Sequence, residues 1–356
     1  TQGMIIGPMA AIRQNSVRLA ASWLGRLQPN TWRAAATCGV SRRDPMLEPR
    51  YAGLGTFMRT PLVCEPSDID IALVGVPYDG ATEGRPGARH GPREIRNMSS
   101  FMRKVHQVSK VNPYELARVG DVGDVPFDHA LDVEHSHGQI YEFVKTLTDA
   151  GVVTLCAGGD HSVALPILRA VAGAAGRPLA LFHFDAHCDT YDEELGNKFA
   201  HGCPFRRATE EGLIDPQRTV QVGIRGAGNS DEAWSFSQAS GMRILFMDEC
   251  SRIGVEAVIA EVRRVLGDGP AYCTFDVDGL DPAFAPGTGT PEIGGFTTVE
   301  AQRLLRGLRG LDLVGGDVVE VSPPFDPSGN TALVGATMMY EILCLLAEAR
   351  AARLRQ

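Results

Sequence analysis

Several features that mark other classes of protein are missing from this chain of 356 residues. No run of eighteen apolar residues occurs, which argues against a membrane-spanning helix. Basic residues do not outnumber acidic ones: the formal net charge is -9 and the isoelectric point about 5.5. A nucleic-acid-binding surface is therefore not expected. The remaining composition, with 44% hydrophobic residues, is that of a globular protein.

Closely spaced cysteines are also missing. The eight cysteines are scattered singly, without a CxxC spacing, and Cys156 and Cys273 lie inside apolar stretches. Such cysteines are typical of buried, reduced thiols in a reducing compartment. A disulfide framework and a cysteine-ligated zinc site are not expected.

Acidic residues are absent from the first 43 residues, which contain six arginines. This composition is typical of an organelle transit peptide, or of a basic arm that contacts a neighbouring chain. The whole chain has only four lysines, and this arginine bias favours a bacterial protein with an arm. We expect residues 1–49 to form the arm, residues 50–356 to form a single domain, and the protein to be cytoplasmic. The mitochondrial matrix is the alternative location.

From about residue 69 onward, short apolar runs alternate with helix-like patterns. Seven runs predict strands, at residues 69–77, 152–158, 179–185, 219–224, 243–248, 271–278 and 313–322. Helices are expected between them, for example over residues 133–150 and 255–267, and again at the end of the chain. Near-continuous apolar strands separated by helices indicate an α/β fold, with a parallel sheet covered on both faces.

Polar motifs directly follow four of the predicted strands. They are GGDH (158–161), DAHCD (185–189), DVDGLDP (276–282) and EVSPP (320–324). In open parallel sheets the active site lies beyond the carboxyl ends of the strands. We therefore expect the four motifs to converge at one edge of the sheet.

The first three motifs offer two imidazoles and four carboxylates as metal ligands. They are His161, Asp185, His187, Asp189, Asp276 and Asp278. Alternate residues of an extended segment share a face, so the ligands within each motif point the same way. Such a set suits two divalent ions, which would activate water for hydrolysis. Its many oxygens favour Mn²⁺, with Ni²⁺ or Zn²⁺ as alternatives.

Each motif taken alone also fits a structural role. GGDH is common turn chemistry, DVDGLDP fits a turn or a calcium-type loop, and DAHCD fits a solvated loop. Their joint position after neighbouring strands favours the metal site. Cys188 lies between two ligands but on the opposite face, where we expect it to pack in the interior.

The motifs together resemble the arginase/agmatinase family of ureohydrolases. The resemblance includes GVPYDGATEGRPGARHGPREIR, the four motifs with their flanks, and HG at 201–202, and covers roughly residues 50–350. It implies a three-layer α/β/α arginase-like fold with a mostly parallel central sheet. It also implies a binuclear manganese site and hydrolysis of a guanidino group to urea and an amine. A homotrimer or homohexamer is implied, with a homologous partner subunit as the alternative.

The resemblance also assigns roles to individual residues. One ion would be held by His161, Asp185, Asp189 and Asp276, and the other by His187, Asp185, Asp276 and Asp278. Glu320 matches the carboxylate that orients the guanidinium, because it can accept two parallel N–H bonds. His201 matches a histidine suited to protonating the leaving amine, and Asp278 is a second proton donor. A structural histidine in a glycine turn is the alternative for His201.

Departures from the family pattern bear on the substrate. The loop TYDEELGNKFAHG lacks the pattern that holds the amino-acid end of arginine in arginases. The segment 89–116 is closer to the bacterial guanidino-acid hydrolases, which implies guanidinopropionate or guanidinobutyrate. Arg89, Arg96 and Tyr78 are candidate contacts for the tail carboxylate, although a surface salt bridge is the alternative for each arginine.

Other substrates and classes stay open. Agmatine, which has a distal ammonium in place of the carboxylate, is one alternative. Gly84 and Cys188 differ from residues common in the family, which leaves guanidine, or a substituted guanidine or biguanide, with nickel as the metal, as further alternatives. A deacetylase-like amidohydrolase and a non-catalytic partner subunit are further alternatives. Glu320 beside the two aspartate motifs favours a ureohydrolase over the first, and the complete ligand set argues against the second.

Overall fold

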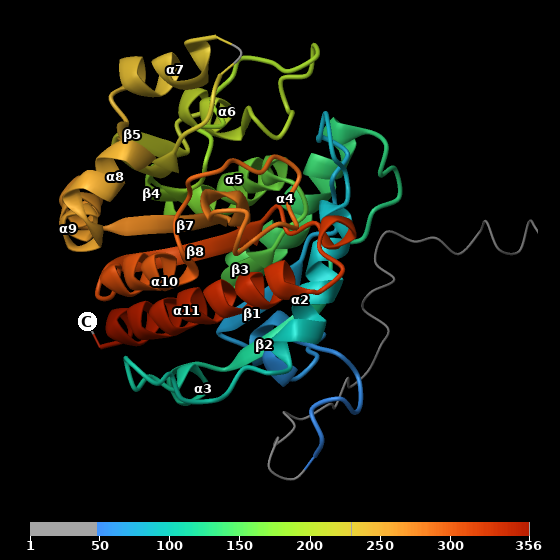
Figure 1. The fold of residues 1–356 in the computed structure, drawn as a ribbon. Helices are drawn as coiled ribbons and strands as arrows, with labels where there is room; N and C mark the ends of the chain where they lie inside the picture. The colour runs from blue at the N-terminus through green and yellow to red at the C-terminus, as the bar shows by residue number, and fades with distance from the viewer. Residues whose placement is uncertain (1–47, 229, 356) are drawn as a thin grey trace, which may run out of the picture. The chain divides into compact units, whose positions relative to one another are not determined.

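The computed structural model describes residues 48–228 and 230–355, which contain one eight-stranded sheet (Figure 1). The strands are β1 (Ile71–Gly75), β2 (Val119–Asp124), β3 (Val153–Ala157), β4 (Leu179–Phe184), β5 (Ile214–Ile224), β6 (Arg243–Phe246), β7 (Pro270–Asp276) and β8 (Asp312–Val319). Their spatial order is β2-β1-β3-β8-β7-β4-β5-β6, and every neighbouring pair is parallel. Nearly all of the predicted arm lies outside the described residues, so its boundary stays a prediction.

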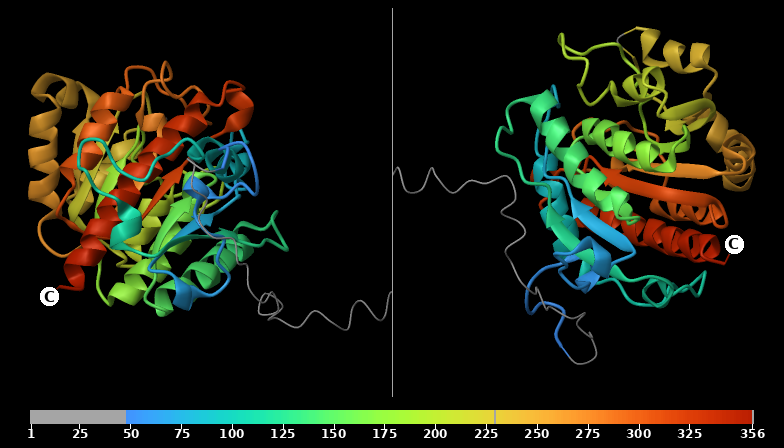
Figure 2. Two further views of the ribbon diagram at one scale, coloured as in Figure 1. Left: turned by 90° about the horizontal axis from the view of Figure 1, so that it is seen from below. Right: turned by 180° about the vertical axis from the view of Figure 1, so that it is seen from behind.

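Helices cover both faces of the sheet, which confirms the predicted three-layer fold. They are α2 (Gly91–Ser99), α3 (Pro113–Leu116), α4 (Val133–Asp149), α5 (Ala164–Ala175), α6 (Pro204–Glu210), α7 (Glu232–Ser240), α8 (Met247–Ile253), α9 (Val255–Leu266), α10 (Thr298–Gly307) and α11 (Asn330–Arg353). Helices α4 and α5 pack on one face, and α2, α9, α10 and α11 on the other (Figure 2).

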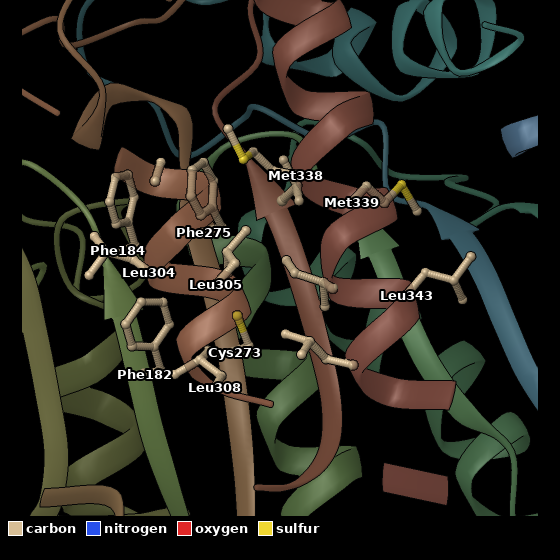
Figure 3. Close-up of a cluster of buried hydrophobic side chains, with 14 of the residues drawn as sticks. Phe182, Phe184, Cys273, Phe275, Leu304, Leu305, Leu308, Met338, Met339 and Leu343 are labelled. Atoms are coloured by element: carbon tan, nitrogen blue, oxygen red, sulfur yellow. The ribbon is translucent and has the colours of Figure 1, made fainter. Parts of the chain in front are cut away.

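Alternation along each strand divides the interior into two apolar cores. On β4, Leu179 and Leu181 face the core beneath α5, while Phe182 and Phe184 face the core beneath α10 and α11. Figure 3 shows the second core, in which Phe184 stacks on Phe275 with ring centroids 4.3 Å apart. Each fully buried side chain of this size contributes about 1.5–3 kcal/mol, so the two cores fix the sheet between the helical layers.

Helix α11 is long and apolar enough to cross a membrane by length and composition alone. Its most apolar window has a mean hydropathy of 1.6, and 83% of that window is buried inside the protein. The helix lies against β8 and α2 and supplies Met338, Met339 and Leu343 to the core (Figure 3). It is therefore the central helix of one layer.

All seven predicted strands are present, but β2 was not predicted. Its sequence, VGDVGD, contains two glycines and two aspartates, which are depleted in strands. Contacts with residues far away in the sequence explain why these residue types stand in the strand. A Cβ on Gly120 would lie 2.5 Å from Val63 Cγ2, and Asp121 accepts a hydrogen bond from the Phe57 amide at 2.9 Å. Local periodicity carries no information on such contacts.

The turn after β3 tolerates only glycine at position 159. A Cβ there would lie 1.5 Å from the carbonyl oxygen of Tyr78, which already accepts a hydrogen bond from the Asp160 amide at 2.8 Å. We expect Gly159→Ala to lower the free energy of unfolding by about 3 kcal/mol or more, because backbone must move to relieve the overlap.

Gly138→Ala in the exposed part of α4 is the matched control for this substitution. No atom lies within 4 Å of its Cβ position, so we expect a gain of about 0.5–1 kcal/mol from helix propensity. Chemical denaturation of both variants measures the difference. Equal stability of the two variants would contradict the account of this turn.

Candidate metal centre

Four adjacent strands in the middle of the sheet, β3, β8, β7 and β4, deliver the predicted functional side chains at their carboxyl ends. β3 leads into GGDH, β4 into DAHCD, β7 into DVDGLDP and β8 into EVSPP. The six predicted ligands and Glu320 are buried, except for one histidine, which is half-buried. The structure therefore brings the four motifs together at one edge, as predicted.

His161 is the centre of one group of ligands. Its Nδ1 lies 3.0 Å from Asp185 Oδ2 and 2.9 Å from Asp189 Oδ2. Asp276 Oδ2 lies 3.3 Å from the same nitrogen. Among the described residues, this buried nitrogen has no hydrogen-bond partner of acceptable geometry. It thus faces three carboxylates across a space that a cation would fill.

His187 forms a second group beside the first. Its Nδ1 lies 3.2 Å from Asp278 Oδ2 and 3.5 Å from Asp185 Oδ1. Asp185 thus turns one oxygen toward each histidine, which is the geometry of a carboxylate that bridges two ions. Asp276 faces the first group through Oδ2, while its Oδ1 accepts a hydrogen bond from the Asp278 amide at 2.8 Å.

The cluster carries more negative charge than a protein interior tolerates. Burial, and then repulsion by Asp278 and Asp185, raises the pKa of Asp276 well above its ordinary value. Burial lowers the pKa of His161, but the surrounding carboxylates outweigh burial and hold that pKa well above its ordinary value. The site therefore attracts positive charge, and its oxygen and imidazole donors fit divalent cations.

A row of polar side chains crosses the sheet one layer below the ligands. Gln221, His183, Thr274 and Asp317 are buried and lie in register across β5, β4, β7 and β8. The Thr274 hydroxyl donates to Asp317 Oδ1 at 2.6 Å, and therefore accepts from Nε2 of His161 at 2.8 Å. Because Nε2 carries a proton, Nδ1 is the nitrogen whose lone pair would bind a metal ion after it gives up its own proton.

His183 in this row is a site residue that the sequence analysis missed. Its Nε2 lies 2.7 Å from Asp185 Oδ2, and Gln221 Nε2 lies 3.1 Å from its Nδ1. Because Gln221 donates to Nδ1, the proton on Nε2 is free to bind Asp185. The pattern LFHFD contained the signal, since His183 and Asp185 are two residues apart in a strand and share a face.

Glu320 and His201 lie together beside the first group. Glu320 Oε1 accepts a hydrogen bond from the His161 amide and lies 2.9 Å from Nδ1 of His201. The backbone of Glu320 has a φ of 61°, a value that non-glycine residues rarely adopt. Glu83, which the sequence analysis did not single out, lies 2.9 Å from the other ring nitrogen of His201.

The candidate tail contacts are already engaged. Arg89 forms an ion pair with Asp79, and Arg96 Nε lies 2.9 Å from Asp121 Oδ2 on the edge strand β2. Tyr78 is buried, and its ring lies against aromatic neighbours. The salt-bridge alternative therefore describes both arginines better than a substrate contact does.

The two positions that depart from the family pattern differ in their surroundings. A Cβ at Gly84 would meet no atom within 4 Å, so this residue faces open space. Cys188 is buried against Ile224 and Ile244, and burial raises the pKa of its thiol. It packs in the interior, as expected, and is not suited to be a nucleophile.

Known proteins resemble this chain over most of its length. The arginase family model matches residues 69–345. A guanidinopropionase from Pseudomonas aeruginosa is 59% identical over 304 residues, which are 85% of this chain and 95% of that protein. A guanidinobutyrase from the same organism is 46% identical over 303 residues, which are 84% and 94% of the two chains. The solved structure of proclavaminate amidino hydrolase from Streptomyces clavuligerus is 39% identical with a TM-score of 0.81, and the match covers 85% of this chain and 100% of that chain. The chain belongs to the arginase family, as an enzyme of the metal-dependent ureohydrolase type that its motifs predicted.

Proposed function

We propose that this protein hydrolyses a small linear guanidino acid, guanidinopropionate or guanidinobutyrate, to urea and an amine. The observation that carries the proposal is the cluster of four buried aspartates with His161 and His187, and with Glu320 and His201 beside it. The similarity to enzymes named guanidinopropionase and guanidinobutyrase supports the substrate class.

Two divalent ions, with Mn²⁺ the preferred metal, would be held by the two groups of ligands. The first group is His161, Asp185, Asp189 and Asp276, and the second is His187, Asp185, Asp276 and Asp278. When bound, the ions would lower the pKa of water and so supply a nucleophile at neutral pH. Nickel or zinc is the alternative, because imidazole and carboxylate donors bind both.

Glu320 would hold the guanidinium next to this centre. Its Oε1 is already shared by the His161 amide and His201 Nδ1, which leaves Oε2 for an N–H of the substrate. Charge-assisted hydrogen bonds of this kind are short and directional. They would fix the guanidinium carbon in place while water attacks it.

Collapse of the tetrahedral adduct requires a proton for the leaving amine. His201 would supply it, because its ring is bonded to the carboxylate that holds the guanidinium. Asp278 is the second candidate, since its Oδ2 lies near His187 and accepts a hydrogen bond from the Thr290 hydroxyl at 3.1 Å.

A cytoplasmic homotrimer or homohexamer is the proposed state of the enzyme, with a homologous partner subunit and the mitochondrial matrix as alternatives. Six cysteines are buried free thiols, which supports a reducing compartment: Cys156, Cys188, Cys203, Cys250, Cys273 and Cys344. The acid-free N-terminal composition is what favours the mitochondrial alternative.

A second candidate substrate lacks the tail carboxylate: agmatine, guanidine, or a substituted guanidine or biguanide. Two observations favour it. The arginines expected to bind a carboxylate are paired with aspartates. In addition, Glu83 places a further carboxylate beside His201, where it would repel an anionic tail that came close.

Urea release tests the proposal directly. We expect manganese-loaded protein to release urea from guanidinopropionate or guanidinobutyrate, and not from arginine. The panel also includes agmatine, guanidine and dimethylbiguanide, each with Mn²⁺, Ni²⁺ or Zn²⁺. Activity restricted to substrates without a carboxylate would establish the second candidate, and no urea from any of them would contradict a ureohydrolase.

Removing the hydroxyl below the metal centre should weaken metal binding. Thr274→Val deletes the acceptor that holds the Nε2 proton of His161, and we expect the affinity for Mn²⁺ to fall about 10- to 100-fold. Isothermal titration calorimetry measures this change. Thr146→Val, at an exposed hydroxyl on α4, is the control and should bind as the parent protein does. An unchanged affinity in Thr274→Val would refute the role of the polar row.

A further inference from the structure

The imidazole of His201 is held between two carboxylates. Its Nδ1 lies 2.9 Å from Glu320 Oε1, and its Nε2 lies 2.9 Å from Glu83 Oε2. The ring is buried, whereas the side chain of Glu83 is 39% exposed. His201 therefore connects the buried carboxylate at the metal centre to a carboxylate that reaches solvent.

The backbone places Glu83 at this position. The Ala81 amide donates to Asp160 Oδ2 at 2.9 Å, and the Ala81 carbonyl accepts a hydrogen bond from the His201 amide at 3.2 Å. The loop after β1 is thereby bonded both to the GGDH turn and to the residue that Glu83 contacts. Its position does not depend on the Glu83 side chain, so a substitution there should leave the loop in place.

Two carboxylates at the two ring nitrogens favour one protonation state of His201. A neutral imidazole donates from a single nitrogen and would turn a lone pair toward the other carboxylate. An imidazolium donates to both. Burial alone lowers the pKa of His201, but Glu320 and Glu83 outweigh burial and raise it well above its ordinary value. The hydrogen bond from His201 in turn lowers the pKa of Glu83 to about 2, so that Glu83 is ionised.

The other acidic groups around His201 act in the same direction. Asp160, after β3, also raises the pKa of His201 when it is ionised, while burial, and then repulsion by Glu320, raises the pKa of Asp160 itself to about 7. Glu194, in the loop between β4 and α6, is also close enough to interact with the ring. Neither Asp160 nor Glu194 bonds to the ring nitrogen that Glu320 leaves open. Glu83 does so, through Nε2.

We propose that Glu83 is a positioning residue, which holds His201 as an imidazolium with its Nε2 proton at the mouth of the site. The inference rests on the proposed function, because it assigns a partner to the residue that protonates the leaving amine. Nδ1 is bonded to Glu320 and Nε2 to Glu83 at the same distance, so the ring keeps a proton on each nitrogen until one proton passes to the leaving amine. Glu83 keeps that proton available between turnovers.

The test compares Glu83→Gln with Glu193→Gln in urea release. Both substitutions remove one negative charge, and Glu193 is exposed in the nearby loop. We expect Glu83→Gln to lower kcat about 10- to 100-fold, with a smaller change in KM, because the loss concerns proton transfer rather than binding. Glu193→Gln should behave as the parent enzyme does.

The pH profile separates this role from a merely structural one. Activity that needs protonated His201 falls as the pH rises through the pKa of the imidazolium. Removing the Glu83 carboxylate lowers that pKa, so the falling limb of kcat should move to lower pH in Glu83→Gln. Glu83→Asp should restore part of the loss, and added formate should partly rescue Glu83→Ala because the position is open to solvent.

Equal metal content and equal melting temperatures would show that the variants are folded and loaded. An unshifted pH profile and an unchanged kcat in Glu83→Gln would overturn the proposal. Failure of the proposed function gives a different result, since the parent enzyme would then release no urea from any guanidino compound.

Discussion

The structure depends on one electrostatic constraint, which is that four aspartates are buried together at the ends of β4 and β7. Like charges at this spacing cannot all be ionised in a low-dielectric interior unless a cation balances them. The pKa values of two neighbouring aspartates, Asp276 and Asp185, shift in opposite directions because of this constraint. The pKa of Asp276 is raised by burial and repulsion, whereas the imidazoles around Asp185 outweigh burial and lower its pKa.

A second layer of polar side chains in the sheet orients the candidate metal ligands. His183, Thr274 and Asp317 lie in register directly below the ligands, and each is fully buried. Burying the Asp317 carboxylate is unfavourable, and burial raises its pKa. The hydroxyls of Thr274 and Tyr272 offset this by donating hydrogen bonds to its two oxygens. Satisfying Asp317 in this way fixes which nitrogen of His161 carries a proton. The candidate metal centre is therefore built from two rows of residues, of which the upper row contains the six proposed ligands.

The sequence predicted those features of the structure that leave a local pattern of apolar and charged residues. Apolar runs predicted seven of the strands because residues buried on both faces leave a continuous hydrophobic signal. The six candidate ligands could be singled out because charged residues directly after apolar runs are unusual, since burying a charge is unfavourable unless it is balanced. His183 could have been identified in the same way, because it is two residues from Asp185 and alternate residues of a strand share a face.

Other features depend on contacts between distant segments. Strand β2 is defined by Gly120 beneath Val63 and by the bonds of Asp121, none of which leaves a periodic signal. Glu83 meets His201 across 118 positions of the chain, through a loop that the GGDH turn holds in place. Single-sequence reasoning sees residue types and spacing, and such pairs become visible only when the sheet has brought their loops together.

The number of divalent ions bound per chain tests the central claim most directly. Protein that has been loaded with Mn²⁺ and freed of excess metal can be analysed by native mass spectrometry and by elemental analysis. The account predicts two ions per chain, because Asp185 turns one oxygen toward each of two histidines. A single ion would contradict the bridging role of Asp185. No bound ion would show that protons alone balance the buried carboxylates, and the account of the site would fail.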